Sequence, residues 1–169
     1  MGGGLTVILL DTSSSMALPV GNRRRADVLA DILGALPVTA GIRRVSFNSV
    51  VTEIGADAWP EPGGGTALAQ ALTFAAAMNP AHVVIISDGE PDNADAAMAA
   101  ARDLGARGCQ IETYFCGDER CHAATAFLRA LAWCSHDGLG RMAVADLTQP
   151  KLLEGELRLA LTHATGPPP

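Results

Sequence analysis

The stretch Ile8–Met16, "ILLDTSSSM", joins an apolar run to a cluster of oxygen-bearing side chains. The run Leu5–Leu10 predicts a buried strand, and Asp11 stands where that strand would reach the surface, followed at once by four hydroxyl residues. Three interpretations are open at this point. The segment is a strand-to-helix turn in which Asp11 caps a helix, a nucleophile site, or a set of ligands for a hard metal ion.

Strand and helix patterns alternate along the rest of the chain. Strands are expected at 5–10, 44–47, 50–54, 82–87, 110–115 and 141–144, and apolar helix faces at 29–36, 68–78, 93–105, 124–131 and 151–162. Only Asn48 and Ser49 separate the second strand from the third, so these two form an antiparallel hairpin. The remaining alternation predicts an α/β, doubly wound, mostly parallel sheet with helices on both faces.

Composition narrows the class of protein. The 169 residues are expected to form one domain over 1–166, with a Pro-rich tail at 167–169. Twelve basic and 18 acidic residues give a net charge of −6, which argues against nucleic acid as a partner.

No run of 18 apolar residues and no positively charged leader is present, so we expect a cytoplasmic protein with no membrane partner. For the oligomeric state, we expect a monomer. Arg23–Arg25 is interpreted as a solvated helix start in preference to a phosphate-binding patch.

Three polar stretches fall on the same edge of this predicted sheet. "DTSSS" follows the first strand, "GGGT" precedes the helix that begins near Thr66, and "SDGEP" follows the most apolar strand. If those two strands are neighbours, Asp11 and Asp88 emerge together and the Gly-rich loop brings Thr66 over them. In an extended D-x-S-x-S segment, Asp11, Ser13 and Ser15 would point the same way. Hydroxyl and carboxylate oxygens suit Mg²⁺ or Mn²⁺.

In order and spacing, the three stretches resemble the metal-ion-dependent adhesion site of von Willebrand factor A domains. The resemblance covers residues 5 to about 162. It implies a six-stranded sheet of order 3-2-1-4-5-6 with strand 3 antiparallel. It also implies that Ser13 and Ser15 bind a metal directly, that Thr66 does so directly or through water, and that Asp11 and Asp88 act through water and hydrogen bonds.

The function implied by this resemblance is divalent-metal-dependent protein binding and not catalysis. An Asp or Glu of a partner protein would complete the coordination of Mg²⁺, or of Mn²⁺ or Ca²⁺. In bacterial single-domain members of the family, the partners include AAA+ ATPases and components of stress or metal-resistance systems. In some members the last helix, here 151–162, shifts when the metal gains its ligand. The rim around the ion is expected to hold Met16, Gly64, Gly65, Glu90 and Asp92.

An enzyme is the rival interpretation of the same residues. A Mg-dependent phosphohydrolase of the haloacid-dehalogenase type would use Asp11 as its nucleophile, but it needs a second acid two residues later, where this chain has Ser13. A Ser-His-Asp hydrolase would need an orienting histidine, and none of the four histidines lies in a recognisable motif.

The cysteines raise a separate question. Zinc ligands or disulfide partners could come from a group of residues after the fifth strand: Cys116, Cys121, His122, Cys134 and His136. Their spacing matches no standard zinc motif, and free thiols are the ordinary state in a cytoplasmic chain of this size.

Overall fold

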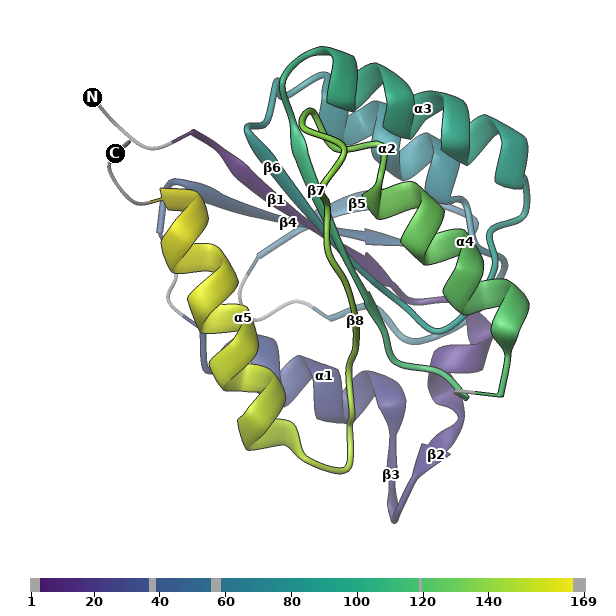
Figure 1. The fold of residues 1–169 in the computed structure, drawn as a ribbon. Helices are drawn as coiled ribbons and strands as arrows, with labels where there is room; N and C mark the ends of the chain where they lie inside the picture. Colours follow the sequence, from purple (N-terminus) through teal and green to yellow (C-terminus); the bar gives the residue numbers. More distant parts are fainter. Residues whose placement is uncertain (1–3, 37–38, 56–58, 119, 166–169) are drawn as a thin grey trace.

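The fold is a six-stranded sheet between two layers of helices (Figure 1). The computed structural model describes residues 4–36, 39–55, 59–118 and 120–165. The strands of the sheet, in chain order, are β1 (Thr6–Asp11), β4 (Ile42–Phe47), β5 (Val51–Ile54), β6 (His82–Ser87), β7 (Gln110–Phe115) and β8 (Met142–Val144). The helices are α1 (Arg25–Gly34), α2 (Leu68–Ala76), α3 (Ala94–Ala106), α4 (His122–Ala132) and α5 (Pro150–Thr165).

The strand order is β5-β4-β1-β6-β7-β8, which is 3-2-1-4-5-6 when the six strands are numbered along the chain. All neighbours are parallel except β4 and β5, which are antiparallel. Both the order and the antiparallel hairpin confirm the prediction. Strand β1 lies between β4 and β6, and Thr6 pairs with Ile42 on one side and with His82 on the other.

Alternate residues of β1 supply two separate cores. Val7 and Leu9 pack in the cluster that includes α2, α3 and α4, whereas Ile8 and Leu10 pack in the cluster that includes α1 and α5. Figure 1 shows the same division, with α2, α3 and α4 on one face of the sheet and α1 and α5 on the other. Because helices cover both faces, the two central strands β1 and β6 are apolar between their polar end residues and do not alternate with polar residues.

The order in which strands are added reverses at β1, and this positions the site. After β1 the chain passes through α1 to β4 on one side of β1, and after β5 it passes through α2 to β6 on the other side. Such a reversal of strand order opens a crevice at the carboxyl ends of the strands. Asp11 ends β1 and Ser87 ends β6, so both lie at that crevice.

The segment between β1 and α1 holds elements that the sequence did not predict. A short 3₁₀ helix, η1 (Ser14–Ala17), is followed by a two-stranded ribbon of β2 (Pro19–Val20) and β3 (Arg23–Arg24). The turn between these strands contains Gly21, whose φ of +62° suits glycine. The predicted tail at 167–169 lies outside the described residues. In the described part of the chain, no helix combines the length and apolar character needed to cross a bilayer.

Candidate metal centre

Backbone hydrogen bonds join the three polar loops at the carboxyl edge of the sheet. The amide of Gly63 donates to the Thr12 carbonyl (3.0 Å), and the amide of Ser14 donates to the Gly64 carbonyl (3.2 Å). The third loop is tied in by Asp92, whose amide donates to the Thr66 carbonyl (3.0 Å). Backbone contacts therefore contribute to the arrangement of the loops in addition to the side chains of the site.

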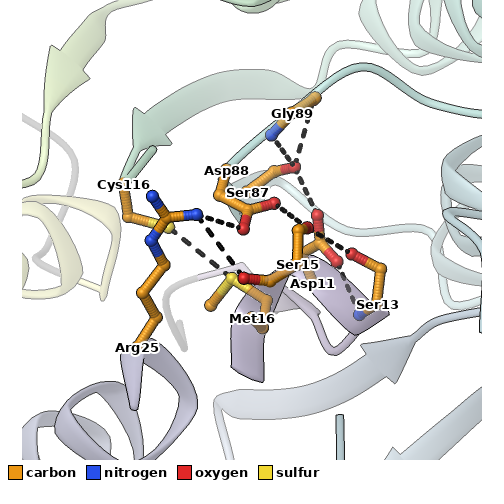
Figure 2. A network of polar contacts seen from close by, with 9 residues as sticks. All are labelled: Asp11, Ser13, Ser15, Met16, Arg25, Ser87, Asp88, Gly89 and Cys116. Atoms are coloured by element: carbon orange, nitrogen blue, oxygen red, sulfur yellow. Dashed lines mark hydrogen bonds and ion pairs between the residues drawn. The ribbon is translucent and has the colours of Figure 1, made fainter. Parts of the chain in front are cut away.

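The carboxylate of Asp11 is held at both oxygens (Figure 2). Oδ1 accepts the amide of Ser13 (2.8 Å), and Oδ2 accepts the hydroxyl of Ser87 (2.7 Å). Asp11 is 1% exposed, and this burial raises the pKa of its carboxyl, although the hydrogen bonds from Ser13 and Ser87 oppose the rise. Asp11 thus fixes the start of the loop and presents no free oxygen to solvent.

Ser13, Ser15 and Asp88 form a chain of oxygen atoms beside Asp11. The hydroxyl oxygens of Ser13 and Ser15 lie 3.1 Å apart, and the Ser15 hydroxyl donates to Asp88 Oδ1 (2.8 Å). The backbone is not the uniformly extended one assumed from the sequence: Ser13 is extended, and η1 begins at Ser14. The turn of η1 still brings the two hydroxyls together, as Figure 2 shows.

This donor set fits a hard divalent cation. All of its atoms are oxygens, which Mg²⁺, Mn²⁺ and Ca²⁺ prefer. Two ligands on adjacent corners of an octahedron lie about 3 Å apart when the metal–oxygen bonds are about 2.1 Å. The hydroxyl oxygens of Ser13 and Ser15 already have close to that separation, at 3.1 Å.

The fifth predicted residue, Thr66, is linked by hydrogen bonds to Asp92, which is not one of the other four. Its amide donates to Asp92 Oδ2 (3.0 Å), so that Thr66 and Asp92 are joined by two hydrogen bonds. Within the described ranges, its hydroxyl makes no hydrogen bond with the other four side chains. Gly64 has a φ of +72°, which favours glycine, and a Cβ at Gly65 would lie 2.6 Å from Asp92 Oδ2 and would displace that carboxylate.

The structure adds a cation, Arg25, that the sequence interpretation missed. Its Nη1 donates to Asp88 Oδ2 (2.9 Å) and lies 3.5 Å from the Ser15 carbonyl oxygen. The Arg25 side chain is 15% exposed, so the interpretation of Arg23–Arg25 as a solvated helix start is wrong for this residue. Arg25 does open α1, as predicted, but the β2–β3 ribbon turns it toward the site. The sequence signal was a basic residue shortly after the D-x-S-x-S segment.

The expected rim requires one correction. Met16 is fully buried, and its Sδ lies 4.0 Å from the Sγ of Cys116, because the turn of η1 directs its side chain into the core. It cannot contact a partner. Gly64 and Glu90 are exposed as expected, and Gly65 is half-buried. Asp92 is exposed, but its carboxylate also holds the Thr66 amide.

The cysteines are free thiols. Cys109 and Cys116 are buried, and burial raises the pKa of both thiols, that of Cys109 to about 12. Across the ranges that the structure describes, no three His, Cys, Asp or Glu side chains are grouped to hold an ion. The disulfide and zinc alternatives therefore find no support.

Comparisons with solved structures support the fold, whereas comparisons of sequence find no match. No protein-family model matches the sequence, and no curated protein matches it. Among solved structures, the chain is similar to the vWF domain of the type V pili tip protein Mfa5 from Porphyromonas gingivalis (TM-score 0.71, 12% identity, 100% of this chain and 98% of that one). It is also similar to manganese-loaded TRAP protein from Plasmodium vivax (TM-score 0.64, 19% identity, 91% and 73%).

A third similar structure is proximal thread matrix protein 1 from the mussel byssus, described as having a zinc-occupied MIDAS motif (TM-score 0.61, 16% identity). The match covers 94% of this chain and 46% of that one, so this chain spans less than half of its length. At these identities the matches show a shared fold.

Proposed function

We propose that this chain, which has the von Willebrand factor A fold, is a non-catalytic module that binds a partner protein through a divalent metal ion. One observation carries the proposal. At the crevice of the sheet, the oxygens of Ser13, Ser15 and Asp88 form a continuous chain with spacings of 3.1 and 2.8 Å, next to a carboxylate that is fixed at both oxygens. This spacing of oxygen atoms supports a donor set for a hard cation.

The five predicted site residues would have different roles in binding the metal ion. Ser13 and Ser15 would bind Mg²⁺ directly through their hydroxyls, and Thr66 directly or through water. Asp11 and Asp88 would hold the ligands and the bound water by hydrogen bonds. Because the nearest ligands are neutral hydroxyls, a bound Mg²⁺ supplies an open, electrophilic position for an anionic oxygen, such as the Asp or Glu carboxylate of a partner.

The comparisons support a divalent ion without deciding which one. The TRAP structure is described as manganese-loaded and the mussel protein as zinc-occupied at its MIDAS motif. We propose Mg²⁺ for this chain, with Mn²⁺ and Ca²⁺ as alternatives, because the oxygen-only donor set disfavours zinc. A bacterial origin, a cytoplasmic location, a monomeric state and a link to an AAA+ ATPase or a stress or metal-resistance system stay predictions.

The geometry argues against the enzyme alternatives. An attacking Asp11 would need an accessible oxygen, but both of its oxygens accept hydrogen bonds and the residue is 1% exposed. Position 13 is a serine, so no acid stands two residues away to protonate a leaving group. The hydroxyls of Ser13 and Ser15 are bonded to one another and to Asp88, with no histidine among their partners in the part of the chain that is described.

Single substitutions at Ser13, Ser14 and Ser15 test the metal site by calorimetry. We expect wild type to bind about one Mn²⁺ or Mg²⁺ per chain, and Ser13→Ala and Ser15→Ala to lose at least about tenfold in affinity, since each loses a hydroxyl ligand. Ser14→Ala is the control, because Ser14 is exposed and only its backbone is bonded to the neighbouring loop. Equal affinity in all four proteins would refute the site. A partner captured in Mg²⁺ should be released by chelator and not captured by Ser15→Ala.

A further inference from the structure

Three consecutive arginines lie at the start of α1, and among the described contacts only Arg25 pairs with one of the five predicted site residues. Arg23 pairs with Asp31 (2.7 Å), and Arg24 pairs with Asp27 (2.8 Å) and with Glu61 (2.9 Å). In each of these pairs both side chains are at least 39% exposed. Water screens such pairs, and they contribute little to stability.

Arg25 is different because its partner is inside the protein. The Asp88 side chain is 1% exposed, and the Arg25 side chain is 15% exposed. Figure 2 shows the guanidinium reaching from the start of α1 to Asp88, on the side away from Ser13. Asp88 Oδ1 is taken by the Ser15 hydroxyl and Oδ2 by Arg25, so both oxygens have a partner. A buried charge pair of this kind is costly to break at one partner.

The pair also sets the charge of the site. Asp11 and Asp88 supply two negative charges and Arg25 one positive charge, which leaves a net charge of −1 among neutral hydroxyls. A divalent ion that entered would meet a fixed cation attached to one of its two nearest carboxylates. Like charges a few ångströms apart in a partly buried site repel strongly. The bound ion would also keep one unit of positive charge that the chain does not neutralise.

We propose that Arg25 is an internal cation of the metal site. It holds Asp88 in place when no metal is bound, and it lowers the affinity for divalent ions, so that a partner carboxylate is needed to balance the charge. The first role stands on the contacts alone, and the second rests on the function proposed above. Arg25 is a positioning residue, since it acts through Asp88 and does not itself bind the ion.

The test compares Arg25→Met with Arg23→Met, which removes an arginine that pairs with Asp31 at the surface. Calorimetry with Mn²⁺ alone should give about tenfold tighter binding for Arg25→Met than for wild type, because a nearby cation is lost. Arg23→Met should bind as wild type does. Arg25→Lys keeps the charge and should stay near the wild-type affinity. Unchanged or weaker Mn²⁺ binding by Arg25→Met would overturn the second role.

Thermal unfolding in chelator tests the first role without any metal. Arg25→Met should unfold about 5 °C below wild type, since Asp88 is left buried and unpaired. Saturating Mn²⁺ should narrow this gap, because binding stabilises the tighter-binding variant more. Equal unfolding temperatures in chelator would overturn the role of Arg25 in the metal-free site. If Arg25→Met does not fold, Arg25→Gln provides the same tests, since it also lacks the charge but can still donate a hydrogen bond.

The outcomes separate this inference from the proposed function. Wild type that binds Mn²⁺ through Ser13 and Ser15, with Arg25→Met unchanged, would overturn the inference and leave the function standing. Binding by wild type, with tighter binding by Arg25→Met, would support both the inference and the function. Failure of both proteins to bind would overturn the metal role of Arg25 together with the function.

Discussion

The two ends of the sheet differ in whether their buried polar groups have hydrogen-bond partners. At the carboxyl end, Asp11, Ser13, Ser87 and Asp88 are buried, and each has a hydrogen-bond partner. At the amino end, the first residues of β1 and β6 pair with each other, yet Thr6 Oγ1 and His82 Nδ1 are buried without any partner among the described residues.

The cavities at the two ends of the sheet also differ in volume. The larger of the two lies at the amino end, where the two buried polar atoms lack hydrogen-bond partners in the described part of the chain. A cavity of about 400 Å³ lies at the amino end, lined in part by His82, Glu112 and Arg141. The one beside Asp11 and Thr12 measures about 40 Å³. The size of a cavity therefore does not locate the proposed site in this fold. The complete pairing of buried polar groups does, because such pairing preorganises ligands and is expensive to leave unfinished.

The largest expected difference in stability is between two variants that each lose a buried hydroxyl, one at each end of the sheet. Ser87→Ala should lower the free energy of unfolding by about 2 kcal/mol, since it removes a buried donor from the Asp11 carboxylate. Thr6→Val removes an equally buried hydroxyl that has no partner, and it should be neutral or slightly stabilising. Urea unfolding in chelator measures both. Equal losses in the two variants would break the comparison between the ends.

A smaller effect concerns pH at the amino end. Burial lowers the pKa of His82, although the nearby Glu112 opposes the shift. The unfolded chain therefore takes up the proton first as pH falls below the usual histidine range near about 6.5, and stability is lost there. From pH 7 to pH 5 we expect a loss of at most about 1.4 kcal/mol per pH unit from this group.

The variant His82→Leu removes the contribution of His82 to the pH dependence of stability. Its urea midpoint should fall less between pH 7 and pH 5 than that of wild type, whereas Thr6→Val, which changes no titratable group, should keep the wild-type difference. A His82→Leu protein with an undiminished loss between the two pH values would show that His82 is not held neutral by its burial.

Much of the fold follows from local patterns in the sequence. The continuous apolar run of β6 and the alternating strand and helix signals depend on near neighbours, and both predictions were correct. The antiparallel hairpin of β4 and β5 was also predicted correctly, but its turn has three residues, 48–50, in place of two. The five site positions came from strand ends and a Gly-rich loop, and their role as metal ligands stays a proposal. Four of them are joined in one hydrogen-bond network, whereas Thr66 is bonded to Asp92.

What the sequence did not predict depends on the path between β1 and α1. The 3₁₀ turn at Ser14 rotates Met16 into the core, and the β2–β3 ribbon returns the chain so that Arg25 faces a residue 63 positions further along. Neither element has apolar periodicity long enough to be recognised. A charge run such as Arg23–Arg25 also gives no sign of which member will be buried, since that depends on the tertiary partner.

The central claim is that a divalent ion binds at the carboxyl end of the sheet, on the hydroxyls of Ser13 and Ser15. Crystals grown with Mn²⁺ and measured for its anomalous scattering test this directly. The account predicts one strong peak within about 2.2 Å of both hydroxyl oxygens, with the carboxylates of Asp11 and Asp88 further away. Absence of a peak there, or a peak only in the cavity beside His82, would contradict it.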